Sequence, residues 1–440
     1  MGRYFGTDGI RGKANVALDV NRAFLVGQCL GHLFSRNRRG KILVGKDTRQ
    51  SSGMFEHAIA AGASSCGADV YLMSTCPTPA VAFLTKEKEF DCGVMISASH
   101  NPFYDNGIKV FSSQGTKLDP KTESQIEDYI DGKSEIELCT EDQIGEIIGY
   151  NEGLEHYLTW MGNIFPLDLS GFRIAVDCAN GSASVTAQRL LERLGADCTV
   201  ICDKPNGINI NTDCGSTHPE RLQQLVKEGN FDLGLAFDGD ADRLIATDSN
   251  GHLLDGDFIL YICGQHMKRK NELNGNTIVT TVMANLGFFK AMERVKINTI
   301  STQVGDKYVY ECMVKEDYVL GGEQSGHIIF KEHSTTGDGL LTACKLLEVM
   351  KETKKTAIEL SEGLDIYPQL LVNVKVQDKQ KVMESPLIKQ AIEEAEKQLD
   401  GNGRILVRPS GTEPLVRVMV EAKTDEICQQ MVQKIVDRIH

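Results

Sequence analysis

The segment VMISASHNPFYDNGIK, residues 94 to 109, holds side chains of the kinds that covalent catalysis uses. An apolar run ends at Ser97 and Ser99, and the proline that follows keeps the next residues from forming a helix. A serine that attacks or carries a phosphoryl group needs a base and a cation nearby. His100 and Lys109 are each candidates for both roles. The segment predicts a serine nucleophile, with Ser97 and Ser99 as equal candidates. A polar hairpin with capping serines is the plain alternative.

Lys109 would come close to the two serines if the chain turned back on itself before reaching the lysine. The pair Asn106 and Gly107 favours a tight turn that leads into a second strand, IKVFS. We therefore expect a turn at this pair to bring the amine of Lys109 toward the serines.

Three aspartates follow another apolar run in AFDGDADR: Asp238, Asp240 and Asp242 occupy every second position. The small residues between them let the chain curl until the carboxylates converge, and such close charges repel one another unless a cation lies among them. Ligands that are all oxygen favour Mg²⁺. An EF-hand needs glycine and glutamate where this loop has arginine and serine, so it does not match that calcium loop. An aspartyl-phosphate site with Asp238 as nucleophile fits the same spacing and stays open.

Two loops combine arginines with glycines. GTDGIRG, residues 6 to 12, places Arg11 beside backbone amides that the glycines leave free to close round an anion. VRPSGTEPLVR, residues 407 to 417, surrounds a turn between two strands with the donors that a phosphate dianion needs: Arg408, Ser410, Gly411, Thr412 and Arg417. Exposed, charged turns are the alternative for both loops.

GGEQSGHI, residues 321 to 328, offers a carboxylate, a hydroxyl and an imidazole. We expect an extended segment here, in which alternation would place Glu323, Ser325 and His327 on one face, where they could bind a polyol. An ordinary polar strand end is the alternative. Taken together, the loops describe an anion pocket, a hydroxyl nucleophile, a cation site and a polyol site. Phosphoryl transfer on a phosphorylated sugar explains all four.

The elements that must position these loops follow an α/β pattern. Short apolar runs rich in valine and isoleucine alternate with longer segments of helical period, and the expected strands include residues 41–45, 68–73, 92–97 and 233–237. After Pro368 the pattern changes to a small α+β unit with a helix around residues 386–399 and a strand-turn-strand over 403–422. We expect four domains, 1–150, 151–250, 251–365 and 366–440, each with one of the loops.

Composition and charge exclude several functions. The chain has 440 residues and a formal net charge of -14, which argues against a nucleic-acid partner. No apolar run reaches the roughly 18 residues of a membrane span, so we expect a cytoplasmic protein without a membrane partner. The 13 cysteines include no C-x-x-C pair, and we expect them to be small core residues in a reducing compartment, not a disulfide frame or a zinc site.

Four motifs, SASHNP, DGDADR, GEQSGH and RPSGTEP, occur in this order, one in each expected domain. Through them the chain resembles the α-D-phosphohexomutase superfamily over essentially its whole length. GTDGIRG, the segment NGININTDCGSTHPE at residues 206 to 220 and the length look most similar to the bacterial branch that interconverts glucosamine 6-phosphate and glucosamine 1-phosphate. The resemblance implies a fold of four domains round a cleft, three of related α/β topology with mixed sheets and a smaller α+β fourth domain.

The resemblance also implies roles for single residues. Ser99, rather than Ser97, would be the phosphoserine, and Mg²⁺ would be held by an oxygen of that phosphoserine and the three aspartates of DGDADR. Lys109 would be the general base or acid, with His100 and His327 as further cations. The remaining matches are Arg11 and Arg243 near the transferring group, Glu323 and Ser325 at the sugar hydroxyls, and Arg408, Ser410, Gly411, Thr412 and Arg417 at the distal phosphate.

The implied reaction passes through glucosamine 1,6-bisphosphate, which also serves as activator, and requires phosphorylation of Ser99. The partner would be a small phosphosugar. A homodimer stays open, because no residue pattern tests it. The alternatives are glucose or mannose phosphates as substrates within the same superfamily, an aspartyl-phosphatase, and a sensor of divalent metal or sugar phosphate without catalysis.

Overall fold

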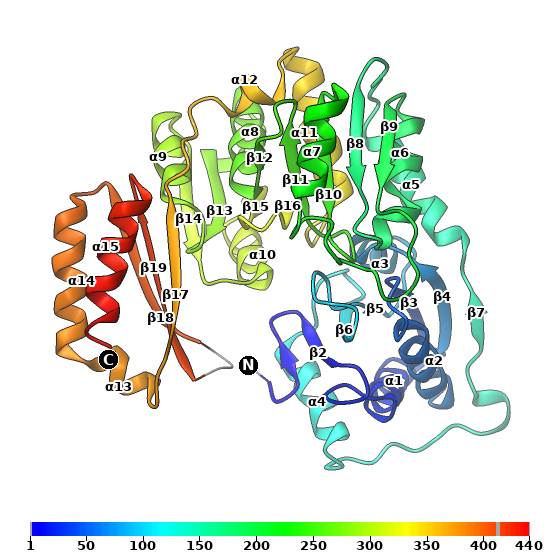
Figure 1. The fold of residues 1–440 in the computed structure, drawn as a ribbon. Coiled ribbons are helices and arrows are strands. Elements are labelled where there is room, and N and C mark those ends of the chain that lie inside the picture. Colours follow the sequence, from blue (N-terminus) through cyan, green and yellow to red (C-terminus); the bar gives the residue numbers. More distant parts are fainter. Residues whose placement is uncertain (1, 411–413, 440) are drawn as a thin grey trace. The chain divides into compact units, whose positions relative to one another are not determined.

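The computed structural model describes residues 2–410 and 414–439, and its internal contacts divide the chain into two units. The first unit comprises Met1–Met283 and Ile297–Ser361, and the second comprises Ala284–Lys296 and Glu362–His440. Figure 1 shows the sheets and helices of each unit, coloured along the sequence. Within the described part of the chain, no helix has the length and apolar character that crossing a membrane requires.

The first sheet of the first unit has seven strands in the order β1-β2-β6-β5-β3-β4-β7. The strands are β1 (Phe5–Gly6), β2 (Gly9–Lys13), β3 (Lys41–Lys46), β4 (Asp69–Thr75), β5 (Cys92–Ile96), β6 (Asp105–Ser112) and β7 (Ile147–Gly149). The helices of this part are α1 (Val20–Phe34), α2 (Ser52–Ser65), α3 (Thr78–Glu87) and α4 (Pro120–Ile130), and α5 (Glu152–Ile164) leads to the next sheet.

The second sheet has the order β12-β11-β10-β8-β9, and the third has the order β14-β13-β15-β16. The second sheet consists of β8 (Arg173–Asp177), β9 (Asp197–Ile201), β10 (Leu233–Phe237), β11 (Leu244–Asp248) and β12 (Leu253–Leu254), with α6 (Ala187–Arg193) and α7 (Glu220–Gly229). The third consists of β13 (Thr277–Thr281), β14 (Asn298–Thr302), β15 (Leu320–Gly322) and β16 (Ile328–Phe330), with α8 (Gly256–Arg269), α10 (Asp306–Lys315), α11 (Gly339–Thr353) and α12 (Ala357–Ser361).

One pattern of four strands recurs in all three sheets. The orders β4-β3-β5-β6, β9-β8-β10-β11 and β14-β13-β15-β16 each contain three parallel strands followed by one antiparallel strand. The mixed sheets confirm the expected α/β fold class. In each sheet the turn into the antiparallel strand carries a motif: the serines follow β5, the aspartates follow β10, and GEQSGH follows β15.

The sequence explains why polar side chains gather at these turns. The strands β5 (CGVMI) and β10 (LGLAF) are buried at every position, as strands covered on both faces are, so the first polar residues come where each strand ends. A turn directly after such a strand stays anchored by the core and is therefore a rigid place for reactive groups.

Helices α1 and α2 pack against each other at close range because glycines of α1 face the backbone of α2. A Cβ on Gly27 would lie 2.3 Å from the carbonyl oxygen of Ile59, and one on Gly31 would lie 2.4 Å from that of Ala63. Any larger residue at these two positions would push the helices apart, so the glycines set the distance between α1 and α2.

The second unit has one antiparallel sheet in the order β17-β19-β18. Its strands are β17 (Gln369–Lys375), β18 (Gly403–Pro409) and β19 (Leu415–Ala422), and its helices are α9 (Leu286–Arg294), α13 (Lys379–Glu384), α14 (Pro386–Leu399) and α15 (Asp425–Val436). The sheet and the helices α14 and α15 share a hydrophobic core that includes Ala395, Val418 and Ile435. The expected domain boundaries near residues 150, 250 and 365 stay a prediction.

Two local expectations are wrong. Asn106 and Gly107 lie inside β6, and the chain turns earlier, at Phe103 and Tyr104. Glycine is needed at position 107 because a Cβ there would lie 2.4 Å from the carbonyl oxygen of Ser97. GEQSGH forms a tight turn between β15 and β16 instead of an extended segment, since Gly326 has a φ of +90°. Alternation therefore does not place its side chains on one face.

Candidate active site

The three aspartates after β10 form a compact, buried cluster. Carboxylate oxygens of Asp238, Asp240 and Asp242 lie within 4.8 Å of one another, and the three residues are at most 3% exposed. The chain curls because Ala241 takes a left-handed φ of 55° and because Gly239 leaves room for the carbonyl oxygen of Ser99, which would lie 2.5 Å from a Cβ. The sequence prediction that the carboxylates converge is thus met in the structure.

The cluster has the donor set of a site for a hard cation. Oδ1 of each aspartate is buried and accepts no hydrogen bond from the residues that the structure describes. Burial and the negative charges of Asp242 and Asp240 raise the pKa of Asp238 to about 8, which shows how poorly this carboxylate is neutralised by the chain itself. Buried carboxylate oxygens without donors fit a divalent cation bound by oxygen ligands.

Lys109 supplies the positive charge on the other side of the cluster. Its Nζ lies 2.8 Å from Oδ2 of Asp240 and 3.1 Å from Oδ2 of Asp242, and its side chain is 3% exposed. Burial alone would lower the pKa of Lys109, but the charges of Asp240, Asp242 and Asp8 raise it well above its usual value. In this arrangement Lys109 is a fixed positive charge, and its role as proton carrier stays a proposal.

Ser99 is the serine that the structure brings to the aspartates. Its Oγ donates a hydrogen bond of 2.6 Å to Oδ2 of Asp238, and the residue is fully buried with a left-handed φ of 52°. The hydroxyl of Ser97 has a different position, because it accepts the backbone N–H of Ser99 at 2.9 Å. Ser97 therefore fixes the strained turn, and Ser99 directs its hydroxyl to the cluster.

His100 lies between Arg243 and Ser99, in surroundings that disfavour the positive charge expected of it. Its Nδ1 accepts an N–H from Nη1 of Arg243 at 3.0 Å and lies 3.4 Å from Oγ of Ser99. Burial and the charges of Arg243 and Arg11 lower the pKa of His100 to about 4. The cation next to Ser99 is therefore Arg243, which also lies 3.9 Å from Asp242.

His327 lies against the aspartates through the turn after β15. The backbone N–H of Gly337 lies 2.8 Å from Nε2 of His327. Burial would lower the pKa of His327, but the charge and hydrogen bond of Asp242 and the charge of Asp306 raise it to about 9. Nδ1 lies 3.7 Å from Oδ2 of Asp242, and Nε2 lies 3.5 Å from Oδ2 of Asp306. The structure thus brings the motifs of three sheets to one cluster of charges.

The turn in GTDGIRG is the tip of the hairpin formed by β1 and β2, with Gly6 opposite Gly9. Its Asp8 forms a hydrogen bond with Arg11 and ion pairs with Lys109 at 3.0 Å and Lys117 at 2.9 Å. Despite burial, Lys109 and Lys117 hold the pKa of Asp8 well below its usual range. The hairpin therefore extends the charge network by a carboxylate, while anion binding by Arg11 stays a prediction.

Glu323 and Ser325, the expected contacts to sugar hydroxyls, differ in exposure. Glu323 is half-buried and accepts the backbone N–H of Gly305 at 3.1 Å, whereas Ser325 is exposed. Their use as sugar contacts stays a proposal.

The expected phosphate loop connects β18 and β19 in the second unit. Arg408 lies directly opposite Arg417 in this hairpin, and burial together with the charge of Arg417 lowers the pKa of Arg408. Like charges opposite one another destabilise a hairpin, and a bound anion would relieve that repulsion. Lys379 adds a third cation, since its Nζ donates to the carbonyl of Ser410 at 2.7 Å. Gly411 and Thr412 lie outside the described residues.

Two residues that sequence reasoning missed hold the backbone of Ser99. Arg49 is paired with Asp47 at 2.8 Å, both side chains are fully buried, and Nη2 of Arg49 donates to the carbonyl of Ser99 at 2.7 Å. Asn211 donates from Nδ2 to the carbonyls of Ser99 at 2.9 Å and Asn101 at 3.1 Å. Asn211 lies in NGININTDCGSTHPE, a segment that contributed to the superfamily resemblance. The sequence did not indicate that this segment contacts the Ser99 turn.

We expect Asn211→Asp to lower kcat by roughly tenfold, because it removes two hydrogen bonds to the turn that positions Ser99. Aspartate tolerates the left-handed backbone of residue 211, so the turn itself should survive. Steady-state kinetics measure the effect, and Asn209→Asp is the matched control, since Asn209 has no hydrogen bond with Ser99. Equal kcat values for both variants would contradict this role.

Four family models match successive parts of the chain. They describe phosphoglucomutase/phosphomannomutase alpha/beta/alpha domain I at residues 2–137, domain II at 154–251, domain III at 255–367, and the C-terminal domain at 371–438. The chain belongs to the phosphoglucomutase/phosphomannomutase family.

Curated relatives in this family match nearly the full length and are named phosphoglucosamine mutase. The protein of Lachnoclostridium phytofermentans is 48% identical over 437 residues, 99% of this chain and 98% of the relative. That of Shouchella clausii is 51% identical over 438 residues, with the same coverage. That of Bacillus subtilis is 50% identical over 439 residues, again with 99% and 98% covered.

Solved structures share the fold at lower identity. A phosphoglucomutase/phosphomannomutase family protein from Burkholderia thailandensis has a TM-score of 0.79 at 22% identity, covering 98% of this chain and 96% of that chain. N-acetylphosphoglucosamine mutase of Aspergillus fumigatus, in complex with GlcNAc-6P and magnesium, has a TM-score of 0.70 at 18% identity, covering 100% and 96%. The full-length relatives named phosphoglucosamine mutase favour a phosphomutase over the aspartyl-phosphatase alternative.

Proposed function

We propose that this protein is a phosphoglucosamine mutase, an isomerase that interconverts glucosamine 6-phosphate and glucosamine 1-phosphate on the route to UDP-N-acetylglucosamine, a cell-wall precursor. The observation that carries the proposal is the hydroxyl of Ser99, held 2.6 Å from Asp238 at the edge of a buried aspartate cluster. The relatives named phosphoglucosamine mutase, about half identical over the full length, support the amino sugar over glucose or mannose.

Ser99 carries the phosphoryl group in this proposal. The bond from phosphorus to Oγ of Ser99 breaks as a bond to the free hydroxyl of the sugar monophosphate forms, which gives glucosamine 1,6-bisphosphate. The bisphosphate turns over in the site and returns its other phosphate to Ser99. The cation held by Asp238, Asp240 and Asp242 is Mg²⁺, which when bound supplies positive charge beside the transferring phosphoryl group.

The chain's own cations stabilise the negative charge that spreads over the transferring oxygens. Arg243 lies beside Ser99 through His100, and its half-buried guanidinium keeps a positive charge close to the reacting atoms. Lys109 orients Asp240 and Asp242. For Lys109 to act as proton carrier, its raised pKa must fall when positive charge enters the aspartate cluster.

The substrate's other end needs sites of its own. We assign its sugar hydroxyls to Glu323 and Ser325, and its distal phosphate to the arginine hairpin of β18 and β19 with Arg408 and Arg417. Because one phosphate site must accept either end of the bisphosphate, the part of the chain from residue 366 onward is expected to open and close as a fourth domain. We place the enzyme in the cytoplasm with glucosamine 1,6-bisphosphate as activator. A homodimer stays open.

The sugar specificity is tested by comparing turnover of glucosamine 1-phosphate, glucose 1-phosphate and mannose 1-phosphate. We expect kcat/KM for glucosamine 1-phosphate to exceed the other two values by at least about tenfold, because a site that pairs with a substrate's polar group rejects analogues that lack it. Equal or higher values for glucose or mannose phosphate would assign the chain to the other activities of its family.

A further inference from the structure

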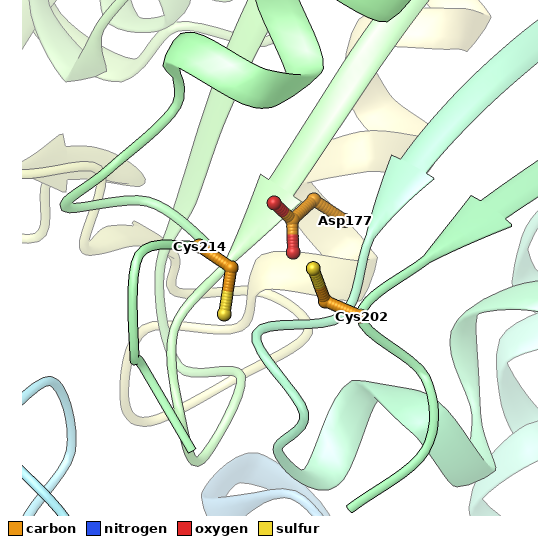
Figure 2. Close-up of side chains that lie close together, drawn as sticks. All are labelled: Asp177, Cys202 and Cys214. Carbon is orange, nitrogen blue, oxygen red and sulfur yellow. The ribbon is translucent and has the colours of Figure 1, made fainter. Parts of the chain in front are cut away.

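A second group of metal-ligating side chains lies at the edge of the second sheet, apart from the aspartate cluster. Figure 2 shows Asp177, Cys202 and Cys214 close together. A carboxylate oxygen and the two sulfur atoms lie within 4.8 Å of one another. Nothing in the proposed reaction uses these three side chains, so their convergence needs its own explanation.

The fold itself brings the three residues together. Asp177 is the last residue of β8, and it lies beside Ile201, the last residue of β9, in the parallel register. Cys202 follows directly, with a left-handed φ of 52°. Cys214 arrives from the segment that precedes α7, and the N–H of its neighbour Gly215 donates to Oδ2 of Asp177 at 2.9 Å. Sequence spacing gave no sign of this group, and no zinc site was expected among the cysteines, because its members are far apart along the chain.

The donor atoms differ in kind from those of the aspartate cluster. Two sulfurs and one carboxylate form a set that suits Zn²⁺, whereas the three aspartates offer oxygen alone and suit Mg²⁺. Three protein ligands leave one tetrahedral position for water. The two groups would therefore select different divalent cations, because sulfur ligands are softer than carboxylate oxygens.

Neighbouring groups hold these donors in place. The carboxylate of Asp177 accepts the N–H of Ala179 on Oδ1 at 2.9 Å and that of Gly215 on Oδ2, which orients it. Nη1 of Arg221 lies 3.6 Å from the sulfur of Cys202, and Nδ2 of Asn180 lies 3.8 Å from the sulfur of Cys214. N–H donors of this kind stabilise thiolates and tune a metal site from outside its ligands.

Access to the group comes from one side. Asp177 is fully buried and Cys214 is 1% exposed, whereas Cys202 is half-buried. All thirteen cysteines are free thiols in the structure, so no disulfide competes for these two. A cation could reach the sulfurs past Cys202 without unfolding the sheet.

We propose that Asp177, Cys202 and Cys214 bind a thiophilic divalent cation, Zn²⁺ in the cell, with water as the fourth ligand. Both thiols lose their protons to solvent as the two metal–sulfur bonds form. The bound cation ties together the two ends of residues 202–214, the segment from which Asn211 donates to the carbonyl of Ser99. Zinc would thus stabilise the support of the Ser99 turn without touching the substrate.

Co²⁺ tests the proposal because a thiolate ligand gives it an intense charge-transfer band in the near ultraviolet. The reduced full-length protein is titrated with Co²⁺ in excess Mg²⁺, and Zn²⁺ is then added. We expect the natural protein to show the band and Zn²⁺ to remove it. Cys202→Ser and Cys214→Ser should each weaken Co²⁺ binding by more than the roughly 10- to 100-fold that follows when a metal ligand loses a hydrogen-bond partner. Co²⁺ in the aspartate cluster has no sulfur ligand and gives no such band.

Cys139→Ser and Cys312→Ser are matched controls, since both thiols are partly exposed elsewhere in the first unit and should leave the band unchanged. A second measurement needs no variant: Zn²⁺ should protect Cys202, the half-buried thiol of the pair, from alkylation, as mapped by peptide mass. Absence of the band, a band that survives both serine variants, or alkylation unaffected by Zn²⁺ would overturn the proposal. So would recovery of Cys202 and Cys214 as a disulfide from untreated protein, which would assign the pair to redox chemistry.

Discussion

Replacing Ser99 by alanine is expected to lower phosphosugar turnover by roughly 10⁴-fold or more, the scale of loss when a covalent nucleophile is removed. The reaction as proposed passes through a phosphate on Oγ of Ser99. Among the hydrogen bonds of the described residues, the aspartate cluster accepts from two hydroxyls, that of Ser99 and that of Thr78, which donates to Asp240. Alanine keeps the backbone donors and acceptors of the turn. The fold and cation binding should therefore survive, as circular dichroism and Mg²⁺ titration would measure.

Ser97→Ala is the matched control for this variant. Its hydroxyl only accepts the N–H of Ser99, so its loss removes one hydrogen bond and should lower turnover by about tenfold at most. The assignment of the nucleophile would be wrong if Ser99→Ala kept substantial mutase activity, or if Ser97→Ala lost as much as Ser99→Ala.

Asp240→Asn should also have a large effect, with turnover falling by roughly 100-fold or more at ordinary Mg²⁺ concentration. Asp240 offers Oδ1 without a donor among the described residues, while Oδ2 accepts from Lys109 at 2.8 Å. Asparagine removes one negative charge from the cation site and leaves Lys109 with one partner fewer. Turnover measured against Mg²⁺ concentration should show a raised requirement that high Mg²⁺ restores in part.

Asp142→Asn is the control, because it makes the same change of charge at an exposed residue outside the cluster. An unchanged Mg²⁺ requirement in Asp240→Asn would mean that the three aspartates do not hold the cation. Chelation supplies a further check on the natural protein, which should lose activity with the metal and regain it when Mg²⁺ is returned.

Local patterns predicted most of the fold. The apolar runs at β5 and β10 are buried on both faces, so their ends and the polar turns after them could be read from the sequence. The helix expected around residues 386–399 matches α14 (Pro386–Leu399), where a proline begins a helix with one apolar face. The recurring order of strands in three sheets was visible only as a repeated architecture, because the residues themselves differ.

The rest depended on contacts between distant parts of the chain. Asn106 and Gly107 have the sequence of a tight turn, but Gly107 serves the close approach of Ser97 to a strand. Arg49 and Asn211 reach the carbonyl of Ser99 from other elements, and local sequence carries no sign of such a contact. The lowered pKa of His100 likewise follows from burial and from Arg243, which comes from another sheet.

The most direct test of the central claim is the mass of the protein before and after incubation with glucosamine 1,6-bisphosphate, followed by peptide mapping. The account predicts one added phosphate on Ser99, within residues 94 to 109, that is stable in acid and labile in base. No added phosphate, a phosphate on Ser97, or a phosphate on Asp238 that mild hydroxylamine removes would contradict it.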